Sequence, residues 1–404
     1  MNQESGVDKD DNSSNINHSF RFLLVSRASR SIGLIFITLS SPLYLLYLHY
    51  SILIIGVIYV FVILSSIILS VGIGMLGDRV GFKTSLLVGE IPALFISVVL
   101  TFTINRDLIL IGIILSGTAG TPGGMRGAFS PGMTAYVAKN WPQNIDRVKK
   151  IGMITAISSV GSIIGAIMLY IHAYVSILFG FVGAFRFLFG IAFALIATSF
   201  LSLMFLKEKP AIKKKEKIMK KSSGKYTARV VLTNVVNGSG IGLAMVLIAP
   251  WFELRYQITP SQVGFIFIWA YLATAIGSYT AGRFYSGNRT SSLKYASGTR
   301  ILQGVLILVV ALSPFLIVSE VIYAFRSAVA GFGSPNRTAV NVSGIEASDY
   351  GASTSIQGVA SRLPQALSGV SGYLMDIYIP MPLILGGAIQ TIGGWVYYKV
   401  LHKL

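Results

Sequence analysis

Three arginines lie within long apolar stretches of the sequence, where a charged side chain is costly and usually functional: Arg126, Arg326 and Arg337. Guanidinium groups donate paired hydrogen bonds to carboxylates and phosphates. Few acids stand near these three, so they predict a binding site for an anionic solute. The alternative is that helix carbonyls, or structural acids such as Glu320 and Glu346, satisfy them.

Other polar residues in apolar stretches are candidates of the same kind. Asn234 and Asn237 are three residues apart and would share one face of a helix, and Tyr44 follows shortly after Pro42. Each could contact a substrate or form an interhelical hydrogen bond. Glu90 also lies in an apolar stretch, and one interpretation of it is a proton carrier, since a desolvated carboxyl group can titrate near neutral pH.

The composition of the chain is that of a membrane protein. Its 404 residues are 53% hydrophobic and only 12% charged, and the mean hydropathy is +0.70. Globular chains are usually about a quarter charged. Apolar stretches of about 20 residues recur along the sequence, which is the length a helix needs to cross a bilayer. The stretch 52–69 does not alternate between apolar and polar residues, as a β-barrel strand would.

The apolar stretches predict an all-α membrane protein with twelve transmembrane helices. Residues 1–27 are expected to form a short, disordered cytoplasmic tail, 28–206 an N-terminal six-helix bundle, 207–226 a basic cytoplasmic linker, and 227–404 a C-terminal six-helix bundle. The predicted spans are 28–48, 52–76, 84–103, 107–137, 148–171, 176–206, 227–252, 261–284, 293–316, 320–344, 351–374 and 381–402.

Lysine and arginine divide unevenly between the two sides of the membrane. With the N-terminus inside, 26 of the 33 fall in inner loops and tails, among them Arg27, Arg30 and Arg300, while only Arg106 and Arg255 fall outside. Because inner loops carry the basic excess, both termini are predicted to be cytoplasmic, in a multi-pass protein of the plasma membrane. The lysine-rich linker is expected to lie against anionic lipid rather than to bind a specific partner.

The two halves of the chain repeat. A shift of 204 residues carries Ser130-Pro131 onto Ser334-Pro335 and Arg79 onto Arg283. The two bundles should therefore be related by pseudo-two-fold symmetry. Transporters built from parallel repeats of this kind hold their substrate between the halves, near the middle of the membrane.

Residues 74–83, between the second and third predicted spans, read Gly-Met-Leu-Gly-Asp-Arg-Val-Gly-Phe-Lys. This pattern resembles the signature loop of the major facilitator superfamily of secondary transporters. The stretches around Ser130-Pro131 and Ser334-Pro335 resemble the same family, although Gly282 stands where the first half has Asp78. The resemblance implies a gating loop made of Gly74, Gly77, Asp78, Arg79, Gly81 and Lys83, with Asp78 engaging the cytoplasmic end of the eleventh helix.

The resemblance also implies that the first, fourth, seventh and tenth helices line a central cavity. Arg126, Arg326 and Arg337 would then be able to face the substrate. Glu90 and Arg186 would lie on helices outside the cavity, which favours a packing role for both. The first span contains no acid. Proton coupling through that helix, as in some drug exporters of the family, therefore has no support.

Enzyme chemistry and cofactors are not expected. The chain has no cysteine and four scattered histidines, so it offers no pattern for a metal site. It also lacks a phosphate-binding Gly-x-x-x-x-Gly-Lys-Ser/Thr loop. Nucleic acid is not an expected partner. The expected partners are the bilayer, a small-molecule substrate and a coupling proton or ion, with the protein acting as a monomer.

These features predict gradient-driven transport, as a symporter or antiporter, of a small anionic or amphipathic organic solute by alternating access. Two alternatives stay open. Aromatic residues such as Tyr44, Tyr47, Trp269 and Tyr271 would suit a multidrug exporter, and a membrane sensor could use the same fold without transporting anything.

Overall fold

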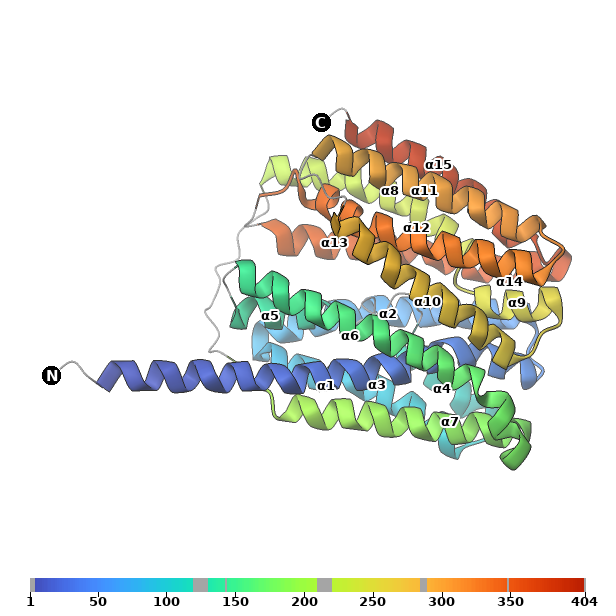
Figure 1. Ribbon diagram of the computed structural model, residues 1–404, viewed down its shortest axis with the longest axis horizontal. Coiled ribbons are helices and arrows are strands. Elements are labelled where there is room, and N and C mark those ends of the chain that lie inside the picture. Colours follow the sequence, from blue (N-terminus) through green and yellow to red (C-terminus); the bar gives the residue numbers. More distant parts are fainter. Residues whose placement is uncertain are drawn as a thin grey trace.

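The computed structural model describes residues 4–118, 130–141, 144–208, 220–283, 289–346 and 349–402, and the secondary structure of these residues is helical. Figure 1 shows the first and second halves of the chain as separate groups of helices, with both chain ends at the same end of the molecule. The first half comprises α1 (Glu4–Tyr47), α2 (Ile52–Val80), α3 (Phe82–Phe102), α4 (Arg106–Ser116), α5 (Ser130–Asn140), α6 (Asn144–Tyr170) and α7 (His172–Met204). The second comprises α8 (Lys221–Ala244), α9 (Ile248–Tyr256), α10 (Pro260–Arg283), α11 (Arg289–Leu312), α12 (Leu316–Val342), α13 (Tyr350–Arg362), η2 (Leu363–Leu367), α14 (Ser368–Ile377) and α15 (Met381–His402).

Nine helical stretches of the described residues are long and apolar enough to cross a membrane. Of the other three predicted spans, the twelfth is the single helix α15 and two are divided into shorter helices. The fourth corresponds to α4 and α5, and α4 ends at Ser116, before Gly117, whose φ of 57° is left-handed. The eleventh corresponds to α13, η2 and α14, with Pro364 in the first turn of η2. Proline cannot donate a backbone hydrogen bond, which favours an interruption at that point.

The first helix is longer than the sequence predicts. Residues 4–18, expected to be a disordered tail, continue α1 beyond the span that begins at Ser19. Figure 1 shows this part of α1 projecting from the first bundle. A helix is costly to nucleate and cheap to extend, so a stable span can propagate into a polar segment next to it.

Glycines allow close helix packing inside each bundle. A Cβ atom on Gly165 of α6 would stand 2.7 Å from the Ile32 carbonyl oxygen of α1. In the second bundle, a Cβ on Gly387 of α15 would stand 2.8 Å from the Gly304 carbonyl of α11. Small residues at such positions let helix backbones approach closely in a membrane.

The two bundles meet through α2 against α14 and through α6 against α10. A Cβ on Gly56 would stand 2.8 Å from the Ser368 carbonyl, and the Ala173 N–H donates to Ser261 Oγ at 2.8 Å. These approaches lie in the half of the molecule remote from the chain termini. On the termini side, a Cβ added to Gly74 of α2 or to Gly152 of α6 would meet no heavy atom of the described residues within 4 Å.

Candidate functional site

The predicted gating loop is shorter than its sequence suggests. Helix α2 continues through Val80, and the single residue Gly81 separates it from α3. Gly81 has φ 109° and ψ 150°, a conformation that is essentially restricted to glycine. A Cβ on Gly77 would collide with the Phe82 ring, so this glycine is required for the turn to pack. The loop is therefore a one-residue turn between two helices.

Glu208 binds the N-terminus of α3. In the sequence it lies two residues after the predicted span 176–206. Glu208 Oε1 accepts from the Phe82 N–H at 2.9 Å, and Oε2 accepts from the Lys83 N–H at 2.8 Å. Lys139 Nζ forms an ion pair with Oε1 at 2.7 Å. A carboxylate at this position satisfies unpaired N–H groups and the positive end of the helix dipole.

These contacts determine the charge state of Glu208. Burial of the carboxyl group opposes its ionisation, but the hydrogen bonds from Lys139, Lys83 and Phe82 and the charge of Lys139 outweigh that effect. The pKa of Glu208 is consequently below its usual value. Through the Glu208 carboxylate, the beginning of the linker contacts both the α2–α3 turn and the end of α5.

The other end of the linker, at Lys220, is bound to the second bundle. Lys220 Nζ donates to Glu346 Oε2 at 2.6 Å, and the Lys220 backbone N–H donates to Asp349 Oδ2 at 3.1 Å. The hydrogen bond to Glu346 raises the pKa of Lys220. Because the Lys220–Glu346 side chains are 62% and 46% exposed, this pair contributes little stability of its own.

A buried polar cluster connects the helices of the first bundle. Arg30 of α1 forms an ion pair with Glu90 of α3, and Ser199 of α7 donates to the other Glu90 oxygen at 2.6 Å. Arg27 donates through Nε to Ser158 of α6. Arg27 and Arg30 were expected in the N-terminal tail or loops, and this placement was wrong because α1 begins well before residue 28.

The second bundle holds a related pair with different chemistry. Arg300 of α11 donates to Asn234 Oδ1 of α8 at 3.2 Å, and its guanidinium lies 4.1 Å from the centre of the Tyr397 ring. Arg300 was also expected in a loop, but it is 5% exposed within α11. By the 204-residue repeat Asn234 corresponds to Arg30, so equivalent helix pairs are joined by an ion pair in one bundle and by an arginine–amide bond in the other.

The predicted substrate contacts fall at several places in the structure. Arg326 is 8% exposed on α12. Arg337, further along α12, folds back along its own helix, where Nη2 donates to the Ala330 carbonyl at 3.2 Å. Tyr44 is fully buried in the first bundle, with its ring centre 5.4 Å from that of Phe185. Asn237 is half-buried on α8, beside Gly393 of α15.

Two predicted residues cannot be placed in full. Arg126 lies outside the described residues, and Asp78 is described as part of α2 without its side chain. Arg79 is exposed, and Lys83 is half-buried. Arg186, expected to pack, donates from Nε to the Thr101 carbonyl at 3.0 Å and so connects α7 to the end of α3.

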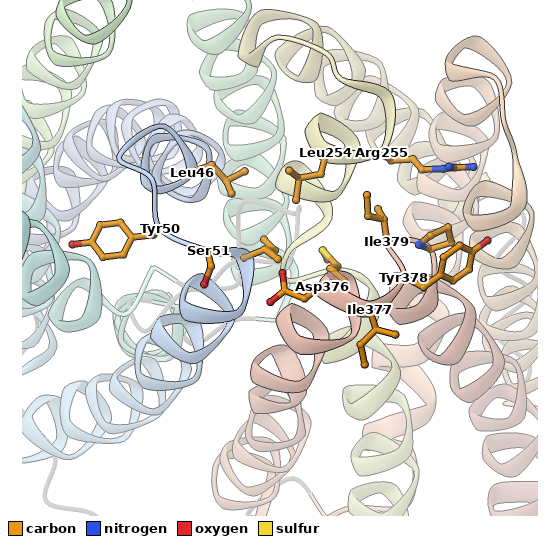
Figure 2. A pocket seen from close by; sticks show the side chains of 12 residues that line it. Leu46, Tyr50, Ser51, Leu254, Arg255, Asp376, Ile377, Tyr378 and Ile379 are labelled. Atoms are coloured by element: carbon orange, nitrogen blue, oxygen red, sulfur yellow. The ribbon is translucent and has the colours of Figure 1, made fainter.

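A cavity of about 600 Å³ opens between the bundles at the end remote from the termini. It is lined by the loop before α2, by α9 and by the end of α14. Figure 2 shows the Asp376 carboxylate directed toward Ser51, while Arg255 points away from both. The lining residues include none of the predicted substrate contacts, so this cavity is a separate feature.

Glu208 and Arg300 are the polar residues that sequence reasoning missed. Glu208 is an acid at the start of a lysine-rich linker, and helix α3 begins directly after a turn. The need of a helix N-terminus for an acceptor could have directed attention to a nearby acid. Arg300 lies within the predicted span 293–316, so the signal that singled out Arg326, a charge inside an apolar stretch, could have found it as well.

Comparison with known proteins identifies the family. The family model described as Major Facilitator Superfamily matches residues 22–369. The search of curated proteins gives no match. Among solved structures, an auto-inhibited POT family peptide transporter is similar, with a TM-score of 0.74 at 12% identity over 96% of this chain and 97% of that chain.

Two further structures show the same fold. The nucleoside transporter NupG has a TM-score of 0.71 at 11% identity, over 95% of this chain and 99% of that chain. The human organic anion transporter MFSD10 (TETRAN) has a TM-score of 0.66 at 15% identity, over 95% and 99% of the two chains. The helical bundles and the family match agree: the chain belongs to the major facilitator superfamily, whose members are non-enzymatic membrane transporters of small solutes.

Proposed function

We propose that this protein transports a small anionic or amphipathic organic solute, driven by the gradient of a coupling ion, as its two bundles rock about a central site. The observation that carries the proposal is the excess of buried cations. Among the described residues, Arg27, Arg30, Arg300 and Arg326 are each at most 8% exposed, while the buried acids are Glu90 and Asp349.

An excess of guanidinium groups in a low-dielectric interior favours anions. Each group presents a planar set of donors that matches a carboxylate or phosphate, and its hydration is weaker than that of an ammonium. Arg326 is the described arginine best placed for direct contact, because it lies on α12, the tenth predicted span. Arg126 remains a second predicted contact. An organic anion transporter is among the proteins of similar fold, which is consistent with the proposal.

The arrangement of the bundles supports alternating access. The approaches at Gly56 and at Ser261 join the bundles in the half remote from the termini, whereas on the termini side Gly74 and Gly152 meet no described heavy atom within 4 Å. With cytoplasmic termini, as the distribution of basic residues predicts, this arrangement corresponds to a state closed to the outside.

The multidrug alternative receives less support. Of the four aromatic residues that suggested it, Tyr44 and Tyr271 are buried within the packed core. Trp269 is 50% exposed and Tyr47 41% exposed. A broad aromatic pocket would require these side chains to face a common cavity.

Thermal unfolding of the purified protein against organic anions, cations and neutral solutes tests the proposal. A ligand that binds the folded state raises the apparent unfolding temperature by mass action. We expect organic anions to raise it, and the rise to be lost in Arg326→Gln and kept in Arg106→Gln, an exposed control. Stabilisation by lipophilic cations alone would instead favour the multidrug alternative.

Flux measurements in proteoliposomes then separate transport from sensing. We expect a stabilising anion to be accumulated when an ion gradient is imposed. An anion that binds and is never translocated under any imposed gradient would contradict the transport proposal and support the sensor.

A further inference from the structure

The buried cluster of the first bundle holds two guanidinium groups and one carboxylate. Arg27 is 4% exposed, Arg30 5% and Glu90 0%. Arg27 and Arg30 lie one turn apart on α1, with Arg27 directed to α6 and Arg30 to α3, as their partners Ser158 and Glu90 show. Among the described residues of the cluster, one positive charge is therefore in excess.

Both oxygens of the Glu90 carboxylate already have hydrogen-bonding partners. Arg30 binds Glu90 Oε2, and Ser199 donates to Oε1 at 2.6 Å. The Ser158 hydroxyl, which accepts from Arg27 Nε, is also paired with Ser31 at 3.0 Å. Arg27 Nη2 is left buried, without a hydrogen-bond partner in the described part of the chain.

Such a donor needs an acceptor. An unmade hydrogen bond from a buried group costs about 1–3 kcal/mol, and more when the group is charged. An anion beside Nη2 would supply the acceptor and balance the charge of the cluster. In a low-dielectric interior both effects are stronger than at a surface.

The surroundings limit what could bind. On the termini side lies an apolar cluster that includes Leu23 of α1 and Ile154 of α6. On the other side the same two helices approach closely, since a Cβ on Gly161 would stand 3.2 Å from the Ala28 carbonyl. Arg27 and Ser158 lie between these two layers, so an acceptor that reaches Nη2 must consist of few atoms.

We propose that Arg27 Nη2, with the Ser158 region of α6, forms a binding site for a small monovalent anion inside the first bundle. The site is independent of the transported solute proposed above. Its ligand is either an inorganic ion such as a halide or a compact carboxylate, and these two sources share the same chemistry.

Anion-dependent stability of the purified full-length protein tests the site. Gluconate, a much larger anion, is replaced by bromide or by acetate at constant ionic strength, and thermal unfolding is followed. We expect a saturable rise in unfolding temperature with bromide, with acetate or with both. A response to bromide alone identifies an inorganic anion, and a response to acetate alone identifies a carboxylate.

Variants locate the site. Arg27→Gln should weaken the apparent anion affinity by about tenfold or more, equivalent to about 1.4 kcal/mol. Arg21→Gln, exposed on the same helix, should leave the affinity unchanged. If Arg27→Gln does not fold, Arg27→Lys keeps the charge, removes Nη2 and should also bind more weakly.

Two results would overturn the proposal. One is the absence of a saturable response to either anion, in which case Nη2 holds only water. The other is an anion affinity in Arg27→Gln or Arg27→Lys equal to that of the unmodified protein. Loss of the organic-anion response in Arg326→Gln would bear only on the transported solute, so the two proposals fail separately.

Discussion

At the scale of single residues, Glu208 shows how one carboxylate can stabilise the tight turn between two helices. It accepts two backbone N–H groups at the start of α3 and an ion pair from Lys139, and its side chain is 12% exposed. Helix-end acceptors of this kind contribute about 1 kcal/mol. Glu208 connects the α2–α3 turn to the linker between the bundles. Loss of its contacts should therefore affect both stability and gating.

We expect Glu208→Gln to lower stability at neutral pH by about 1 kcal/mol, because an amide keeps one acceptor oxygen and loses the charge. The pKa of Glu208 is lowered in the folded protein, so its contribution is complete above the unfolded-state pKa and disappears as the pH falls through the folded-state value. The difference in unfolding temperature between the two proteins, measured from pH 7 downward, should therefore persist to about pH 4.5 and then narrow. A difference that does not change with pH would show that the charge of Glu208 is unimportant.

The sequence predicted residue types better than partners. It indicated a turn around Gly81 and arginines within apolar stretches, yet Glu208 bonds to residues more than 100 positions earlier, and Arg30 pairs with Glu90 across 60 positions. Pairings of this kind depend on how helices pack in space. A single sequence has no local pattern that specifies them.

At the scale of elements, the lengths of the apolar stretches predicted the helices well. The interruptions within those helices were harder to predict. The described helices occupy the predicted spans, but α4 ends at Ser116, before Gly117, and the eleventh span is divided by η2. Glycine and proline signal such breaks only as tendencies, because neighbouring helices can satisfy the freed backbone groups in a membrane. The extension of α1 to Glu4 was missed because its residues are polar.

The α2–α3 junction gives a matched pair of substitutions. Gly81→Ala should destabilise the protein by about 1–3 kcal/mol, since φ 109° is strained for any residue with a Cβ. Gly74→Ala lies in α2 with open space around it and should be neutral or stabilising by up to about 1 kcal/mol. Unfolding temperatures of both variants measure the contrast. Equal changes in unfolding temperature for the two variants would mean that the positive φ of Gly81 is unimportant for the fold.

At the scale of the whole molecule, the bundles are joined where Ala173, at the start of α7, donates its N–H to Ser261, at the start of α10. Rocking of the bundles must break this contact for the remote end to open. The chain contains no cysteine, so a pair introduced here would form the single available disulfide. Ser261 Oγ lies 2.8 Å from the Ala173 nitrogen, so the two residues are in direct contact across the bundles.

We expect Ala173→Cys combined with Ser261→Cys to lose transport after mild oxidation and to regain it after reduction, because the disulfide holds the remote end closed. Each single variant should transport equally under both conditions, and thiol labelling should confirm that the bond has formed. Binding of solute from the termini side should survive in the oxidised protein, which distinguishes a locked transporter from a damaged one. Full transport with the disulfide demonstrably formed would mean that the bundles need not separate at this point, and the rocking mechanism would have to be replaced by movement within a bundle.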